Sequence, residues 1–247
     1  MIIIYLCIFF LGASLASFLN ATLYRIDKKY QYPEIITKNS HCEKCKRQLN
    51  WIELFPIFGY ILIRGKCSSC GNKIPLYYPL SEMFLGISFL LFYLYSIPFV
   101  YALVILFLFV LSYYDNIYMA VSKNIVHIFL VLCCLIFLIN PNLYNLIAPL
   151  VLSVILIVVN LFKKSFGIGD ILVLVGLGII LEYSEFLILF WVGIIFALLY
   201  SLSLVLFKKV NIKKAKVPMI PFFSLAFLVS IFWGDILFNS LLKFLGM

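Results

Sequence analysis

Two aspartates lie in apolar stretches where an ionised side chain is costly. Asp170 closes the segment Gly167-Ile168-Gly169-Asp170, and Asp115 lies near the end of another hydrophobic run. A charged group at bilayer depth costs roughly 2.5–3.5 kcal/mol on insertion scales, so an acid at such a position indicates a function by default. Two such acids predict a carboxylate pair that performs general acid–base chemistry, as in an aspartic protease.

Two cysteine pairs form a second group of residues that could do chemistry. Cys42-x2-Cys45 and Cys67-x2-Cys70 are separated by 21 residues, a spacing that favours one tetrahedral zinc site with four thiolate ligands. Four protein ligands leave no position for a water molecule, so the zinc is expected to be structural and to stabilise a segment with few core hydrophobes. Two separate redox-active cysteine pairs are the alternative.

Membrane-spanning helices must position these groups, because the 247 residues are 65% hydrophobic and only 12% charged. A helix needs about 20 apolar residues to cross a bilayer. We therefore expect an all-α polytopic membrane protein with about eight transmembrane helices and a small zinc-ribbon-like insertion between helices 1 and 2. The expected spans are 2–24, 79–96, 99–119, 124–140, 144–162, 168–182, 186–208 and 219–243.

The spans divide the chain into three expected domains. These are a first transmembrane helix (1–24), a cytoplasmic zinc-binding domain (25–78) and a transmembrane peptidase domain that contains both aspartates (79–247). Gly167 and Gly169 are expected to permit backbone conformations that other residues avoid, and to let a peptide approach Asp170 closely. Irregular backbone at this depth is tolerated where it lines a wet cavity.

The basic residues lie almost entirely on one side of the expected topology. With an external N-terminus, the loops of one side carry 18 of the 19 lysines and arginines, and only Lys243 falls on the other side. Because cytoplasmic loops are enriched in such residues, the net charge of +9 indicates orientation and contact with anionic lipid, not nucleic-acid binding. Asp115 then ends the third span and Asp170 begins the sixth, so both lie at cytoplasmic helix ends.

Several further residues and segments follow one another along the chain: 12–20 with Tyr24-Arg25, Ser40-His41, Trp51, Pro56, 64–66, Gly71, Ile74, 78–79 with Glu82, and 217–222. Their order resembles that of the type IV prepilin peptidases, which are bifunctional leader peptidases and N-methyltransferases of the bacterial cytoplasmic membrane. The two aspartates and both cysteine pairs fall where this family has them. Val121-Ser122 and Leu172 depart from the family pattern, which usually has Ile-Pro and a lysine at these positions.

The resemblance implies a substrate and a second reaction. Asp115 and Asp170 would cut the short basic leader from prepilins or pseudopilins at the cytoplasmic face, in a system of type IV pili, protein secretion or competence. The new N-terminus would then be methylated from S-adenosylmethionine, with Glu82 as a candidate for this second activity. The alternative for Glu82 is a carboxylate near a helix start that is stabilised by the helix dipole.

Two functions of other classes remain open from the residues. A non-catalytic assembly scaffold would use the zinc site to bind a partner and the acids as polar contacts between helices. A proton-coupled transporter would use Asp115 and Asp170 as a relay. A further acid, Asp235 in the last span, is expected to make a polar contact between helices or to lie near the surface, and a third catalytic acid is the alternative.

Overall fold

The computed structural model describes residues 1–139, 141–162, 166–208, 217–244 and 246. The chain divides into two compact units, residues 1–102 and 103–247. Both units are built from helices, and the described residues contain no β-structure beyond isolated bridges.

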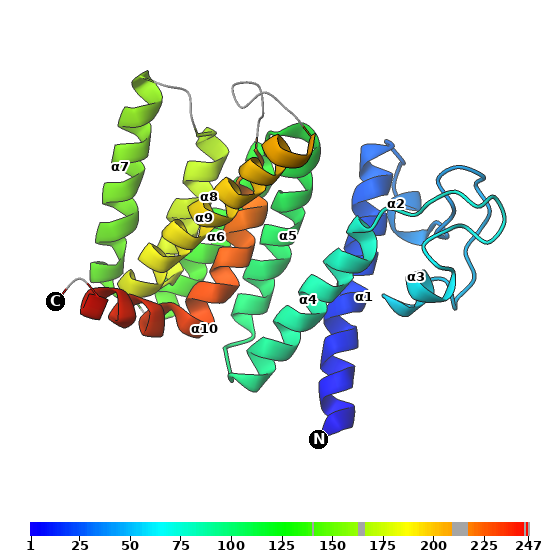
Figure 1. The fold of residues 1–247 in the computed structure, drawn as a ribbon, viewed down its shortest axis with the longest axis horizontal. Coiled ribbons are helices and arrows are strands. Elements are labelled where there is room, and N and C mark those ends of the chain that lie inside the picture. The colour runs from blue at the N-terminus through cyan, green and yellow to red at the C-terminus, as the bar shows by residue number, and fades with distance from the viewer. Residues whose placement is uncertain (140, 163–165, 209–216, 245, 247) are drawn as a thin grey trace. The chain divides into compact units, whose positions relative to one another are not determined.

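The first unit is organised by two long helices that lie side by side, α1 (Ile2–Asp27) and α4 (Tyr77–Leu94) (Figure 1). Glycines let their backbones approach closely: a Cβ atom added at Gly12 would lie 2.5 Å from the carbonyl oxygen of Leu85. Gly86 has the same role on α4, because an added Cβ would lie 2.8 Å from the Phe9 ring. Small residues at a helix crossing are typical of packing in membranes.

The segment between α1 and α4 contains two short helices, α2 (Glu34–Thr37) and α3 (Phe58–Leu62), and two cysteine turns. Each turn is closed by a single antiparallel bridge, His41 with Gln48 and Lys66 with Lys73. Extended loops account for most of this segment, so regular secondary structure contributes little to its stability.

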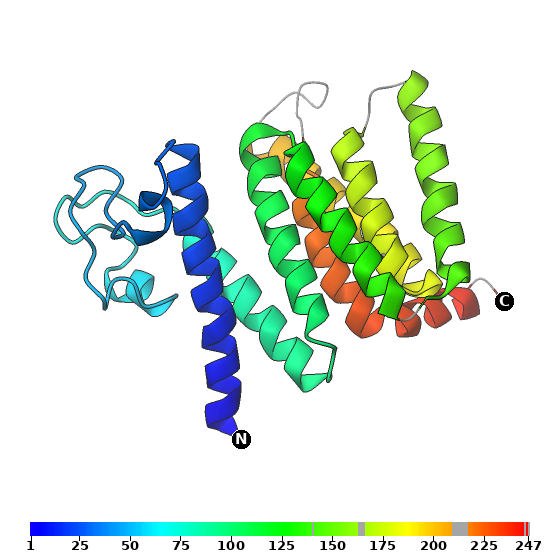
Figure 2. The same ribbon diagram turned by 180° about the vertical axis from the view of Figure 1, so that it is seen from behind.

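The second unit contains α5 (Val100–Tyr118), whose first three residues belong to the first unit, and six further elements. The helices α6 (Lys123–Ile139) and α8 (Ile168–Ile180) pack together, as do α9 (Tyr183–Lys208) and α10 (Ile220–Phe244) (Figure 2). A Cβ at Gly193 of α9 would lie 2.5 Å from the ring of Phe223, which is fully buried in α10. The six elements are α6 (Lys123–Ile139), η1 (Leu143–Leu146), α7 (Ile147–Phe162), α8 (Ile168–Ile180), α9 (Tyr183–Lys208) and α10 (Ile220–Phe244).

The eight expected spans correspond to eight apolar helices, which confirms the all-α polytopic fold class. Among the described residues, six helical segments are long and apolar enough to cross a membrane: α1, α4, α5, η1 with α7, α9 and α10. The other two, α6 and α8, have 17 and 13 residues. The unit boundary falls inside α5, and the expected three-domain division remains a prediction.

Candidate functional site

Asp115 is buried near the end of α5 and is held by the start of α10. The residue is only 5% exposed, and its Oδ2 accepts a hydrogen bond of 3.0 Å from the backbone N–H of Ile220. The N–H of Met219 also bonds to this carboxylate. The first N–H groups of a helix have no hydrogen-bond partner within the helix. Asp115 of α5 accepts such bonds at the N-terminus of α10, although the two residues of the Ile220 bond are 105 positions apart in the chain.

Asp170 lies in the first turn of α8 and bonds to the backbone that precedes its own helix. The N–H of Gly167 donates to Asp170 Oδ2 at 3.1 Å. A carboxylate in the first turn also interacts favourably with the helix dipole. Asp170 is therefore held in place by its own helix.

The second unit brings the two predicted aspartates together. The carboxylates of Asp115 and Asp170 are close enough for a direct electrostatic interaction. Each also lies at a helix N-terminus, where backbone N–H groups and the dipole favour negative charge. The sequence alone did not predict that the N–H groups of Ile220 and Met219 bond to Asp115. The available signal in the sequence was Pro218, which precedes the start of α10.

The glycines of the Gly-Ile-Gly-Asp segment correct one prediction. Gly167 has φ −68° and ψ 144°, which any residue can adopt, and Gly169 lies within α8. Unusual backbone conformation is therefore not the reason for these glycines. Space is the reason: a Cβ at Gly167 would lie 3.0 Å from Asp170 Oδ2, and one at Gly169 would lie 3.2 Å from Val121 Cγ2.

The four predicted cysteines form one cluster in the first unit. Their sulfur atoms all lie within 4.8 Å of one another, with Cys42 and Cys70 separated by 3.8 Å and Cys45 and Cys67 by 3.9 Å. A tetrahedron of sulfurs about 2.3 Å from a zinc ion has edges of about 3.8 Å. The donor set therefore fits a single structural zinc ion.

The backbone of the cysteine turns favours the thiolate form of Cys67 and Cys42, the form that a metal requires. N–H groups of Cys70 and Ser69 bond to the sulfur of Cys67 and lower its pKa to about 6. The N–H of Cys45 similarly lowers the pKa of Cys42. The pKa of Cys70 is about 11, because desolvation and proton sharing among the thiols outweigh an N–H bond from Asn72.

An ion pair that sequence reasoning missed links the two cysteine turns. Arg47, beside the first turn, contacts Glu53 at 2.6 Å and also donates to Ser68 Oγ of the second turn at 2.6 Å. Desolvation acts to raise the pKa of Glu53, but bonds from Ser68, the N–H of Asn50 and Arg47 lower it overall. The loop is thereby fastened around the sulfur cluster.

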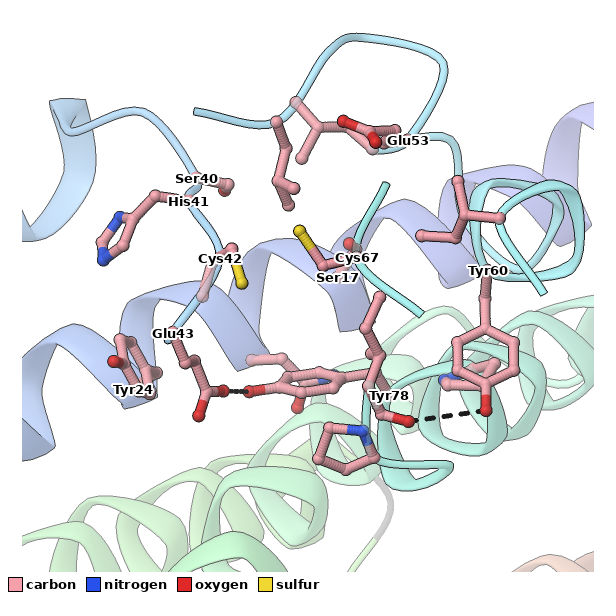
Figure 3. Close-up of a pocket in the computed structure, with 18 of the residues that line it drawn as sticks. Ser17, Tyr24, Ser40, His41, Cys42, Glu43, Glu53, Tyr60, Cys67 and Tyr78 are labelled. Atoms are coloured by element: carbon pink, nitrogen blue, oxygen red, sulfur yellow. Dashed lines mark hydrogen bonds between the residues drawn. The ribbon is translucent and has the colours of Figure 1, made fainter. Parts of the chain in front are cut away.

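A cavity of about 350 Å³ lies within the first unit, between the cysteine turns and the facing ends of α1 and α4. Cys42 and Cys67 form part of its wall, together with three tyrosines (Figure 3). Tyr78 donates a hydrogen bond of 2.7 Å to Glu43, which fixes one side of the opening. Small-molecule sites typically begin at about 300 Å³, so the cavity is large enough for a small ligand.

Glu82 lines the same cavity and is tied to a strained loop. The N–H of Ile57 donates to Glu82 Oε2 at 2.7 Å, and Ser17 also bonds to this carboxylate. Ile57 has φ 65°, a conformation that is costly for a β-branched residue. Glu82 is the sixth residue of α4 and lies in the wall of the cavity; its role in methylation remains a prediction.

The last predicted contact is confirmed in the second unit. Ser184 Oγ of α9 donates to Asp235 Oδ1 of α10 at 2.5 Å. Asp235 thus makes a polar contact between helices.

Several known proteins that are similar to this chain carry the same name. Residues 10–96 match the family model described as "Bacterial Peptidase A24 N-terminal domain". A prepilin leader peptidase/N-methyltransferase of Myxococcus xanthus is 33% identical over 33% of this chain and 24% of its own length, and one of Vibrio cholerae is 33% identical over 32% and 34%. The matched segment thus spans about a third or less of these relatives.

A longer match exists in another organism. A prepilin leader peptidase/N-methyltransferase of Bacillus subtilis is 25% identical over 96% of this chain and 97% of its own length. No solved structure matches the chain.

Proposed function

We propose that the chain, whose residues 10–96 match the bacterial peptidase A24 N-terminal domain model, is a membrane-embedded aspartic endopeptidase. Its substrates would be prepilins or pseudopilins, from which it removes the leader peptide. The long similarity to the Bacillus subtilis prepilin leader peptidase/N-methyltransferase supports this substrate class.

The observation that carries the proposal is the electrostatic interaction between the carboxylates of Asp115 and Asp170. Two adjacent carboxylates tend to share one proton. The ionised carboxylate takes a proton from a water molecule, whose oxygen attacks the carbonyl carbon of the scissile peptide bond. The protonated carboxylate donates to the carbonyl oxygen, which gives a tetrahedral intermediate. As the C–N bond breaks, the leaving amine receives the proton that the first carboxylate took from water, and a hydroxyl of the intermediate returns a proton to the second carboxylate.

The remaining groups of the second unit hold this pair in place. The N–H of Ile220 orients Asp115, and the N–H of Gly167 orients Asp170. The absence of a Cβ at Gly167 leaves the space beside Asp170 Oδ2 free. The excess of lysines and arginines on one side supports an active site that faces the cytoplasm, in a bacterial cytoplasmic membrane.

The second activity in this proposal is methylation of the new N-terminus. S-adenosylmethionine would supply the methyl group when bound, and the cavity of the first unit fits such a molecule in size. Tyr24, Tyr60 and Tyr78 offer flat surfaces for an adenine ring, and Glu82 offers negative charge for a cationic ligand. Cys42, Cys45, Cys67 and Cys70 would hold zinc, which maintains the cavity wall.

The test uses the purified full-length protein and a synthetic peptide with a basic leader followed by an apolar segment. Mass spectrometry of both products distinguishes cleavage from methylation. We expect wild-type protein to cut the peptide, and Asp115→Asn and Asp170→Asn variants to leave it intact. An uncut peptide with wild-type protein refutes the proposal, and cleavage by both variants assigns the aspartates a scaffold or transport role instead.

A further inference from the structure

One residue that lines the cavity carries a buried polar atom that has no hydrogen-bond partner among the described residues. Asn20 of α1 is 2% exposed, and within the described residues its Oδ1 accepts no hydrogen bond. Buried acceptors without a partner are uncommon in native proteins, and each one calls for an explanation such as a ligand. Asn20 lines the cavity, so a ligand in the cavity is the natural source of the missing donor.

Neighbouring groups fix which end of the Asn20 amide lacks a partner. Ser81 Oγ donates its only proton to the carbonyl oxygen of Tyr78 at 2.8 Å. It can therefore only accept from Asn20, whose Nδ2 lies 2.7 Å away. The amide nitrogen faces Ser81, and the carbonyl oxygen remains as an acceptor for a group that carries N–H or O–H.

The charged groups around the cavity favour a cation. Three carboxylates line it, against Arg25 and Lys73. Glu53 is already paired with Arg47, and Glu43 accepts a hydrogen bond from Tyr78. This leaves Glu82, which has no cationic partner among the described residues, as the carboxylate available to a cation. The Arg25 guanidinium is already engaged, with Nη1 donating to the carbonyl oxygens of two residues of α2 at 2.9 and 3.3 Å. An anion would find few available donors here, whereas a cation finds acceptors.

Glu82 has unused acceptor capacity. An ionised carboxylate has about four lone-pair sites, and the bonds from Ile57 and Ser17 occupy two of them. The strained conformation of Ile57 is held by this same carboxylate. Strain of this kind is concentrated at ligand sites, where it fixes a group in a required position.

We propose that the cavity binds a primary amine, held by Asn20 Oδ1 and by the carboxylate of Glu82. This inference rests on the proposed methyl transfer, which needs an amine as acceptor. Leader removal frees such an amine at the new N-terminus, and this is the ligand to which the observations point. The amino group of the methyl donor has the same chemistry, so the experiment must separate the two sources.

The experiment measures binding to the full-length protein in detergent. The probes are an apolar decapeptide with a free N-terminal amine, the same peptide with an acetylated N-terminus, and S-adenosylhomocysteine. The variants are Asn20→Leu, which removes the acceptor, Asn20→Asp, which keeps it, and Glu82→Gln. Ser81→Ala is the matched control, because it breaks the Asn20 contact but leaves Oδ1 in place.

We expect Asn20→Leu to weaken binding of the free-amine peptide by about tenfold or more, and not to change binding of the acetylated peptide. Asn20→Asp should retain the wild-type preference for the free amine, and Glu82→Gln should reduce it. A matching loss for both peptides, or an equal effect of Ser81→Ala, would indicate a purely structural role and overturn the inference.

Two further outcomes identify the source of the amine and the level at which the reasoning fails. If Asn20→Leu weakens only S-adenosylhomocysteine, the cavity binds the amino group of the methyl donor and the assignment to the processed N-terminus is wrong. Leader cleavage by wild-type protein is measured in the same preparation. Cleavage without any dependence of amine binding on Asn20 refutes this inference alone, and no cleavage refutes the proposed function.

Discussion

Two substitutions of Asp115 should separate its catalytic role from its role in holding α10. Asparagine keeps one carbonyl oxygen, so the N–H of Ile220 retains an acceptor, but it cannot take or hold a proton. Alanine removes both functions and leaves the N–H groups of Ile220 and Met219 without this acceptor in a buried position.

The structure sets the size of both effects. A buried N–H without a partner costs about 1–3 kcal/mol, and a protein of this size loses about 2–4 °C of melting temperature for each kcal/mol. Asp115→Ala should therefore melt several degrees below Asp115→Asn. Both variants should lose at least about 100-fold in cleavage rate, the lower bound for general acid–base catalysis.

The assays are mass spectrometry of peptide cleavage and a thermal melt of the protein in detergent. Asp235→Asn is a matched control, because Asp235 is an acid of α10 whose bond to Ser184 does not involve the aspartate pair. Its cleavage rate should equal that of the wild type. Cleavage by Asp115→Asn within tenfold of the wild type would refute the catalytic role, and equal melting of the Asn and Ala variants would refute the role in holding α10.

Three further outcomes follow from the geometry. Gly169→Ala should lower cleavage several-fold, because its Cβ would lie 3.2 Å from Val121; Val121→Ala in the same chain should restore the rate, and no rescue would contradict the steric cause. Cys67→Ser should release zinc, measured by metal analysis, and abolish methylation while cleavage continues; a zinc content equal to the wild type would show that Cys67 is not a ligand. Glu53→Gln should speed zinc release to a chelator, because it removes the ion pair with Arg47. Since the pKa of Glu53 is lowered, the difference in release rate between the wild type and Glu53→Gln should shrink as the pH falls through that pKa, and a difference that is the same at every pH would argue against it.

Predictions from local sequence were accurate where one physical cause dominates. Apolar runs of about 20 residues fold as helices, because backbone polar groups in a bilayer must be satisfied within the segment. The expected span 99–119 is helical over 100–118, and 219–243 over 220–244. The four cysteines converge because two short turns of the same kind leave few other arrangements for a shared metal.

The prediction that Gly167 and Gly169 have unusual backbone conformations was wrong for a general reason. A glycine can be required by its backbone conformation or by the space around it, and sequence alone does not distinguish the two. At Gly167 and Gly169 the relevant neighbours are Asp170 and Val121, and the second of these comes from a loop far away in the chain.

Composition, periodicity and charge distribution by themselves determined that this chain is a bundle of membrane helices with acids at helix ends and a four-cysteine loop. Each of these properties depends only on the residues of one segment and on the lipid or water around it, so the sequence of that segment predicts it. Tertiary structure alone decided what holds the acids and what the loop encloses. The N–H of Ile220 reaches Asp115 across 105 positions, and Asn20 meets Ser81 across 61. Such contacts depend on how helices pack in three dimensions. They hold Asp115 in place, and they leave Asn20 Oδ1 as an acceptor without a partner among the described residues.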